Sequence, residues 1–188
     1  MKSLLLALTI ASPCFAFSQL SDFDFTQAGY PEFPVDEATQ MVDYSEVVDV
    51  EGKSADELYD LGLEWINAYF KNSSSVMQVK DKESHTLEGK HSFYVMKDIK
   101  GSSVKGELIK YQFTLRFRDG RYKYNVTRIN VQKSAYYGIE KWILGEDSFA
   151  DENIPDYLDQ IHEFFTEDFI LSMTEGIQPK KVVKEEDW

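Results

Sequence analysis

Few groupings of residues in this chain are of the types that carry out chemistry. Its three histidines, His85, His91 and His162, have neither the H-E-x-x-H nor the H-x-H spacing of zinc sites. The patterns G-x-S-x-G, G-x-G-x-x-G and G-x-x-x-x-G-K-S/T, which mark serine nucleophiles and phosphate-binding loops, do not occur in the 188 residues. We therefore predict no catalytic residue, no metal site and no cofactor, and we interpret the histidines as surface or sheet-edge residues.

The acidic residues are too numerous to define a site from the sequence. Asp and Glu together number 33, so any pair of carboxylates chosen for glycoside chemistry is arbitrary. The acidic run Glu146–Asp156 lacks the spacing of a calcium-binding loop, and we interpret it as a solvated loop. Asp168 differs, because it falls on the apolar arc of the last predicted helix. It is a functional acid, the partner of a Lys or Arg at the sheet rim, or the mark of a bend in the helix.

The best candidate for a binding surface is a row of polar side chains on one predicted β-hairpin. Between residues 109 and 118 apolar and polar residues alternate strictly, and Asp119-Gly120 is a two-residue hairpin signal. The polar positions of both strands therefore share one face. We predict that ligand or partner binding involves five of them: Lys110, Gln112, Arg116, Lys123 and Asn125. The alternative is an ordinary solvated face of an antiparallel sheet.

The same hairpin predicts a register. Folding at Asp119-Gly120 gives three cross-strand pairs on the apolar face: Phe117–Tyr122, Leu115–Tyr124 and Phe113–Val126. Downstream the apolar positions shift by one residue, to Ile129 and Val131. A β-bulge near Thr127-Arg128 would explain this shift.

The remaining elements follow from apolar periodicity and helix-capping signals. Residues 40–50, 76–80 and 86–96 have strand-like patterns. Ser54 and Glu57 form a capping box that begins a helix ending near Phe70, and Gly62 is a notch in its apolar arc. The pattern of residues 135–144 predicts a short helix, and that of residues 155–176 predicts a second long helix. We predict an α+β fold of β-α-β-β-β-β-α order, with the helices on one face of an antiparallel sheet.

We divide the chain into a signal peptide (1–18), an extended leader (19–38), a single domain (39–176) and a mobile tail (177–188). A basic start, an apolar run at 4–11 and the small residues Ala16 and Ser18 predict cleavage before Gln19, and a secreted or periplasmic protein. The only cysteine, Cys14, follows a proline rather than a small residue, which disfavours lipid attachment. The leader offers four aromatic residues for packing on the domain: Phe23, Phe25, Tyr30 and Phe33.

The charge balance limits the partners. The formal net charge is −13, with 20 Lys and Arg against 33 Asp and Glu. Nucleic acids and anionic membrane surfaces repel such a chain. After the predicted signal peptide no apolar stretch is long enough to span a bilayer as a helix. We therefore expect an envelope protein or a glycan as partner, with no nucleic acid and no membrane span.

Several segments resemble a known family. They are Phe33–Asp36, Val42–Val50, Gly52–Tyr59, Trp65, the turn at Asp81, and Leu87–Lys90. Together they are similar to a secreted Bacteroidetes family of unknown function with a TBP-like fold, the fold of the TATA-box-binding protein, over about residues 33–132. The resemblance implies the fold, but it carries no known chemistry and no catalytic residue to transfer.

These observations favour a non-catalytic binding or interaction module, secreted or periplasmic, of unknown ligand. The alternative is a carrier that holds an apolar ligand in a cavity between the sheet and the last helix. An uncharacterised hydrolase is the third hypothesis. The carrier hypothesis requires a cavity lined by aromatic residues, namely Phe93, Tyr111, Phe113, Tyr124, Phe164 and Phe165.

Overall fold

The computed structural model of the protein describes residues 19–146 and 151–178. The predicted signal peptide lies outside the described residues, as do 147–150 of the acidic loop and 179–188 of the predicted tail. Within the described residues no helix is long and apolar enough to cross a membrane.

The centre of the fold is a five-stranded antiparallel sheet in the order β3-β7-β6-β5-β4. Its strands are β3 (Tyr44–Asp49), β4 (Met77–Asp81), β5 (Thr86–Ile99), β6 (Ser102–Arg118) and β7 (Arg121–Val131). A two-stranded sheet of β1 (Val35–Asp36) and β2 (Met41–Val42) precedes them.

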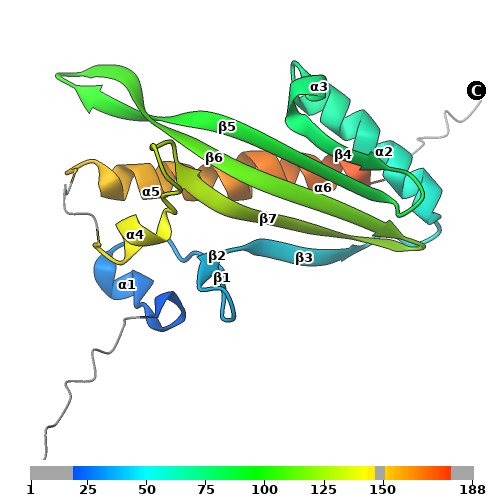
Figure 1. Ribbon diagram of the computed structural model, residues 1–188, viewed down its shortest axis with the longest axis horizontal. Helices are drawn as coiled ribbons and strands as arrows, with labels where there is room; N and C mark the ends of the chain where they lie inside the picture. The colour runs from blue at the N-terminus through cyan, green and yellow to red at the C-terminus, as the bar shows by residue number, and fades with distance from the viewer. Residues whose placement is uncertain (1–18, 147–150, 179–188) are drawn as a thin grey trace, which may run out of the picture.

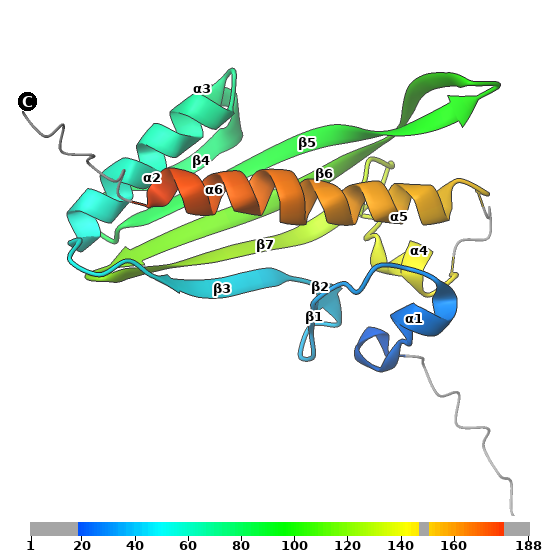
Figure 2. The same cartoon turned by 180° about the vertical axis from the view of Figure 1, so that it is seen from behind.

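The helices cover one face of the sheet. Helix α2 (Ala55–Tyr69) lies beside a long helix formed by α5 (Ile154–Glu163), the π-helical segment η2 (Phe164–Phe169) and α6 (Ile170–Ile177). Figure 2 shows this pair in front of the sheet, whereas Figure 1 shows the opposite face without a covering helix. The predicted β-α-β-β-β-β-α order and the helical face are confirmed. The short helices α3 (Ser73–Val76) and α4 (Glu140–Ile143) lie at the borders of the sheet.

The predicted hairpin register is confirmed. Phe117 is opposite Tyr122, Leu115 is opposite Tyr124 and Phe113 is opposite Val126. The bulge is also where the sequence indicated, since the register shifts after Gln112↔Thr127 to Lys110↔Asn130. Arg128, inside the bulge, has a φ of 53°, and the extra residue returns Ile129 and Val131 to the buried face.

Capping and close packing fix α2 on the sheet. The Ser54 hydroxyl accepts from the Glu57 N–H, and the Glu57 carboxylate accepts from the Ser54 N–H, which confirms the capping box. Gly62 is buried and faces Phe117 of β6, so the predicted notch is present.

The segment 19–38 is not the extended leader that we predicted. It contains the 3-10 turn η1 (Leu20–Asp22) and the short helix α1 (Phe25–Ala28). The Asp24 side chain accepts from the Gln27 N–H at 2.8 Å and so caps α1. The aromatic residues of this segment do pack on the domain, and Phe33 is 2% exposed.

The tip of the β5–β6 hairpin extends further than predicted. β5 continues to Ile99, beyond the strand predicted over 86–96, and the turn is at Lys100-Gly101, where both residues have positive φ. Beyond the end of β4, the outer edge of β5 is covered by a side chain. Gln160 of α5 accepts from the Met96 N–H at 2.7 Å and donates to the Met96 carbonyl at 2.8 Å.

Asp168 lies on the surface, not on the buried arc of the last helix. The wider π-helical turn of η2 changes the angular spacing, so Phe165, Phe169 and Met173 face the core while Asp168 is exposed. Its carboxylate accepts from the Tyr69 hydroxyl at 3.0 Å, so its partner is not a Lys or Arg. The helix irregularity that the structure contains at this position is a π-turn.

Candidate functional site

The open face of the sheet carries the polar side chains predicted from the hairpin. Because side chains alternate between the two faces of a strand, the residues next to the buried ones point away from the helices. Arg116 is opposite Lys123, and Thr114 is opposite Asn125. The same alternation on β5 places Lys90 beside Gln112 and Ser92 beside Lys110.

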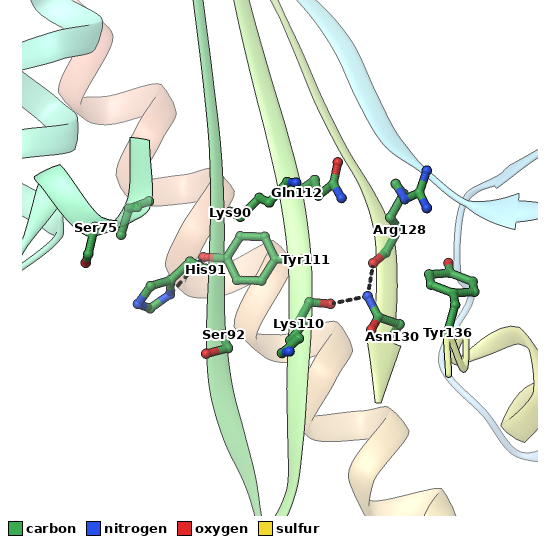
Figure 3. Close-up of a pocket in the computed structure, with 11 residues that line it drawn as sticks. Ser75, Lys90, His91, Ser92, Lys110, Tyr111, Gln112, Arg128, Asn130 and Tyr136 are labelled. Atoms are coloured by element: carbon green, nitrogen blue, oxygen red, sulfur yellow. Dashed lines mark hydrogen bonds between the residues drawn. The ribbon is translucent and has the colours of Figure 1, made fainter. Parts of the chain in front are cut away.

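A hollow of about 500 Å3 lies on this face, across β5, β6 and β7, and we call it the main hollow. Figure 3 shows Ser75 of α3 on one side and Tyr136, from the segment after β7, on the other. Its lining contains three cations, Lys90, Lys110 and Arg128, and no acidic residue. The full lining is Ser75, Val76, Lys90, His91, Ser92, Lys110, Tyr111, Gln112, Arg128, Asn130 and Tyr136.

The bulge in β7 forms one wall of the main hollow. The Asn130 amide donates to the Arg128 carbonyl at 2.6 Å and to the Lys110 carbonyl at 3.4 Å, as Figure 3 shows. The Arg128 guanidinium lies 5.4 Å from the centre of the Tyr136 ring, within cation–π range. These contacts hold a cation at the rim, while Lys90 and Lys110 remain free of ion pairs with any described residue.

The five predicted binding residues do not form one cluster. Lys110 and Gln112 line the main hollow. Arg116 and Lys123 line a second hollow of about 340 Å3 nearer the β6–β7 turn, which we call the hairpin-end hollow. Asn125 lines neither of them, and its amide donates to the Asp43 carboxylate, which ties β7 to the residue preceding β3.

Of the polar residues that line the main hollow, sequence reasoning identified Lys110 and Gln112 and missed the others. Lys90 and Ser92 are two residues apart on β5, so strand alternation places both on one face, and they could have been assigned to the open face. The predicted bulge could have placed Arg128 and Asn130 there as well. Tyr136 has no such signal, because the path of residues 132–139 brings it to the sheet, where Asn130 pairs with Gly138.

The three histidines are partly buried, and His162 lies on α5 against Phe33 and Tyr44, so it is not the surface or sheet-edge residue that we predicted. His91 Nδ1 lies 3.4 Å from the Tyr111 hydroxyl, and His162 Nδ1 lies 3.3 Å from the Tyr44 hydroxyl. Burial lowers the pKa of both imidazoles. His85 Nε2 lies 2.9 Å from the Asp56 carboxylate. In the part of the chain that the structure describes, no three His, Cys, Asp or Glu residues are grouped to hold a metal ion.

The aromatic residues proposed for a carrier cavity pack on one another. Phe93 and Phe164 stack with ring centroids 3.8 Å apart, and Tyr111 packs edge-on against Phe165 at 5.1 Å. Tyr124 is 6% exposed, and its hydroxyl donates to the Glu46 carboxylate at 3.0 Å. These contacts are those of a filled core, so no observation favours the carrier hypothesis.

The antiparallel sheet, with one helical and one open face, defines an α+β protein of the TBP-like class. Residues 44–132 match the model of the family described as a domain of unknown function (DUF4468) with TBP-like fold. The resemblance noted from the sequence is therefore confirmed. Among curated proteins no sequence matches the chain.

Two solved structures support the same fold. A DUF4468 family protein from Bacteroides ovatus ATCC 8483 is 16% identical, with a TM-score of 0.60 over 85% of this chain and 98% of that chain. A TBP-like protein from Parabacteroides distasonis ATCC 8503 is 18% identical, with a TM-score of 0.59 over 73% of this chain and 92% of that chain. At these identities the likeness shows the fold alone.

Proposed function

We propose that the protein is a non-catalytic binding module of the cell envelope, and that the main hollow holds a carboxylate-bearing chain. The observation that supports the proposal is the lining, in which three cations and no acid gather on one face of a chain with a net charge of −13. Charge-assisted hydrogen bonds from Lys and Arg to carboxylates are among the stronger polar contacts.

The polar neighbours of the cations suit an extended ligand. Ser92, Gln112 and Asn130 lie beside Lys110 and Lys90 in the strand register, so donors and acceptors continue across three strands. An acidic polypeptide segment and a uronic acid glycan both present carboxylates along a linear backbone. The carboxylate is the chemistry that they share, and it is what the three cations would recognise.

Nucleic acid is not the proposed ligand, although the fold takes its name from a DNA-binding protein. The net charge of −13 repels a duplex, which carries about one negative charge per 1.7 Å of its axis. The export of the protein is part of the proposal, and it rests on the features of residues 1–18.

Fluorescence anisotropy with labelled oligoglutamate and labelled oligogalacturonate tests the proposal. We expect one of the two probes to bind, with an affinity that falls as salt rises. Lys90→Gln combined with Lys110→Gln should weaken this binding at least tenfold. Lys80→Gln combined with Lys100→Gln is the control, because it removes the same charge from exposed residues that line neither hollow. Equal losses in the two double variants, or no binding of either probe, would refute the proposed function.

A further inference from the structure

The hairpin-end hollow contains the densest group of cations on the open face. Arg116 and Lys123 are directly opposite each other on β6 and β7, and Arg118 and Arg121 form the next pair towards the turn. All four side chains are exposed and line the same hollow. Two like-charged pairs therefore stand side by side at one end of the hairpin.

The neighbouring residues leave most of this charge unpaired. Arg116 is opposite Thr86 on β5, and Lys123 is opposite Val47 on β3. Asp49 is the acidic residue in register with the cluster, opposite Arg121. Among the residues that the structure describes, no carboxylate lies within ion-pair distance of any of these four cations.

The acid of the turn is engaged elsewhere. The Asp119 carboxylate accepts from the Ala55 N–H at 2.8 Å, at the start of α2, and so points away from the open face. Like charges directly opposite on neighbouring strands destabilise a sheet. The free protein therefore carries a repulsion that a bound anion would relieve.

The shape and chemistry of the hollow indicate what kind of anion it fits. Its volume of about 340 Å3 accommodates a tetrahedral oxyanion and part of an attached organic group. Guanidinium groups bind such oxyanions through paired N–H donors, and three of the four cations are arginines. Val47, which is 51% exposed, gives the hollow an apolar wall for the organic part.

We propose that the hairpin-end hollow is a binding site for a tetrahedral oxyanion, a phosphate or a sulfate, either free or as an ester. Arg116, Arg118, Arg121 and Lys123 bind the anion, and Val47 contacts the carbon atoms of an ester. The inference goes beyond the proposed function, because it concerns different residues and a different ligand. The two hollows share no lining residue.

Backbone amide NMR at constant ionic strength tests the site with four probes: inorganic phosphate, inorganic sulfate, glucose 6-phosphate and glucose 6-sulfate. We expect saturable shifts of the amides of residues 116–123 with at least one probe. An ester that binds more tightly than its free anion identifies the ester as the ligand. Shifts that do not saturate, or that spread over the whole surface, would refute the site.

Matched variants separate this site from the main hollow. Arg116→Gln combined with Arg121→Gln should weaken oxyanion binding at least tenfold, and Lys90→Gln combined with Lys110→Gln should leave it within twofold. Without oxyanion and at low salt, the arginine variant should melt no lower than the parent, since it removes repulsion. A lower melting temperature would mean that the arginines are structural, and would overturn the inference. Loss of carboxylate binding in the lysine variant bears only on the proposed function.

Discussion

Gly62 of α2 lies directly against Phe117 of β6. A Cβ atom at residue 62 would be 2.5 Å from Cζ of Phe117, a distance at which either the buried Phe117 ring or the helix must shift. The absence of a side chain at this position therefore sets how closely α2 approaches the sheet.

Gly62→Ala should destabilise the protein, although alanine normally favours a helix interior over glycine. The normal gain is about 0.5–1 kcal/mol. Here the added methyl overfills the contact with Phe117, and we expect a net loss of about 1–3 kcal/mol in the free energy of unfolding. Urea denaturation measures it. In a chain that already carries Phe117→Leu, Gly62→Ala should cost less than it does in the parent. An equal cost in the two backgrounds would contradict the steric explanation.

Adjacent residues on β6 should differ sharply in their contribution to stability. Phe113 is 2% exposed and stacks on Phe70 with ring centroids 5.8 Å apart, whereas Thr114 faces the open side. We expect Phe113→Ala to lower the free energy of unfolding by about 3–5 kcal/mol. Thr114→Ala should change it by no more than about 0.5 kcal/mol. Similar losses in denaturant melts would mean that the register is wrong.

Neutral substitutions on the open face should not lower stability. Lys110→Gln, Arg116→Gln and Lys123→Gln each remove a cation that forms no ion pair with a described residue. Their melting temperatures should equal or exceed that of the parent at low salt. Asn125→Ala is the contrasting variant, since it removes the hydrogen bond to Asp43 and should cost about 1 kcal/mol. If all three cation variants melt lower, these side chains are structural.

The protein should lose stability in mild acid. Burial lowers the pKa of His91 and His162 in the folded state, although Asp159 and Glu167 partly oppose this for His162. The unfolded chain then binds protons more readily, with a histidine pKa of about 6.5. The stability contributed by the neutral imidazoles is present in full above that pH. It decreases as the pH falls from there towards the folded-state values.

Urea melts between pH 5 and pH 7.5 measure this dependence. The variant His91→Asn combined with His162→Asn should show a flatter dependence on pH than the parent. An unchanged slope would assign the effect to other groups.

The mature protein should begin at Gln19. Mass spectrometry of the protein from the periplasm and the culture medium gives the mass of its N-terminal peptide. A product that retains an acylated Cys14, or one found only in the cytoplasm with Met1 in place, would contradict the predicted processing.

The hairpin could be predicted because each of its signals is local. Strict alternation, the Asp119-Gly120 turn and the phase shift before Ile129 all lie within about 20 residues, so register and bulge follow from the chain itself. The capping box at Ser54 and the notch at Gly62 are local in the same sense. Such signals identified the open face and the polar residues of β6 and β7 that lie on it.

The errors concern features that depend on distant contacts. Regular α-helical spacing places Asp168 on the buried arc, and nothing in the sequence of residues 164–169 indicates the π-turn that moves it to the surface. The partner of Asp168, Tyr69, is 99 residues away. Likewise, Ser75 and Tyr136 bound the main hollow on its two sides. They are far apart in the sequence and lie beside the sheet only in the folded chain.

The two hydrogen bonds between Gln160 and Met96 have a consequence for the solubility of the protein. An uncovered strand edge recruits the edges of other molecules and begins their aggregation. Here the side-chain amide of Gln160 makes the two hydrogen bonds that a peptide group of a further strand would make. It satisfies both the N–H and the carbonyl of Met96, which face outwards. The β5–β6 hairpin can therefore extend beyond β4 without offering the backbone of Met96 for pairing with a strand of another molecule. Gln160→Leu removes both hydrogen bonds and leaves the N–H and carbonyl of Met96 open to the strand edges of other molecules.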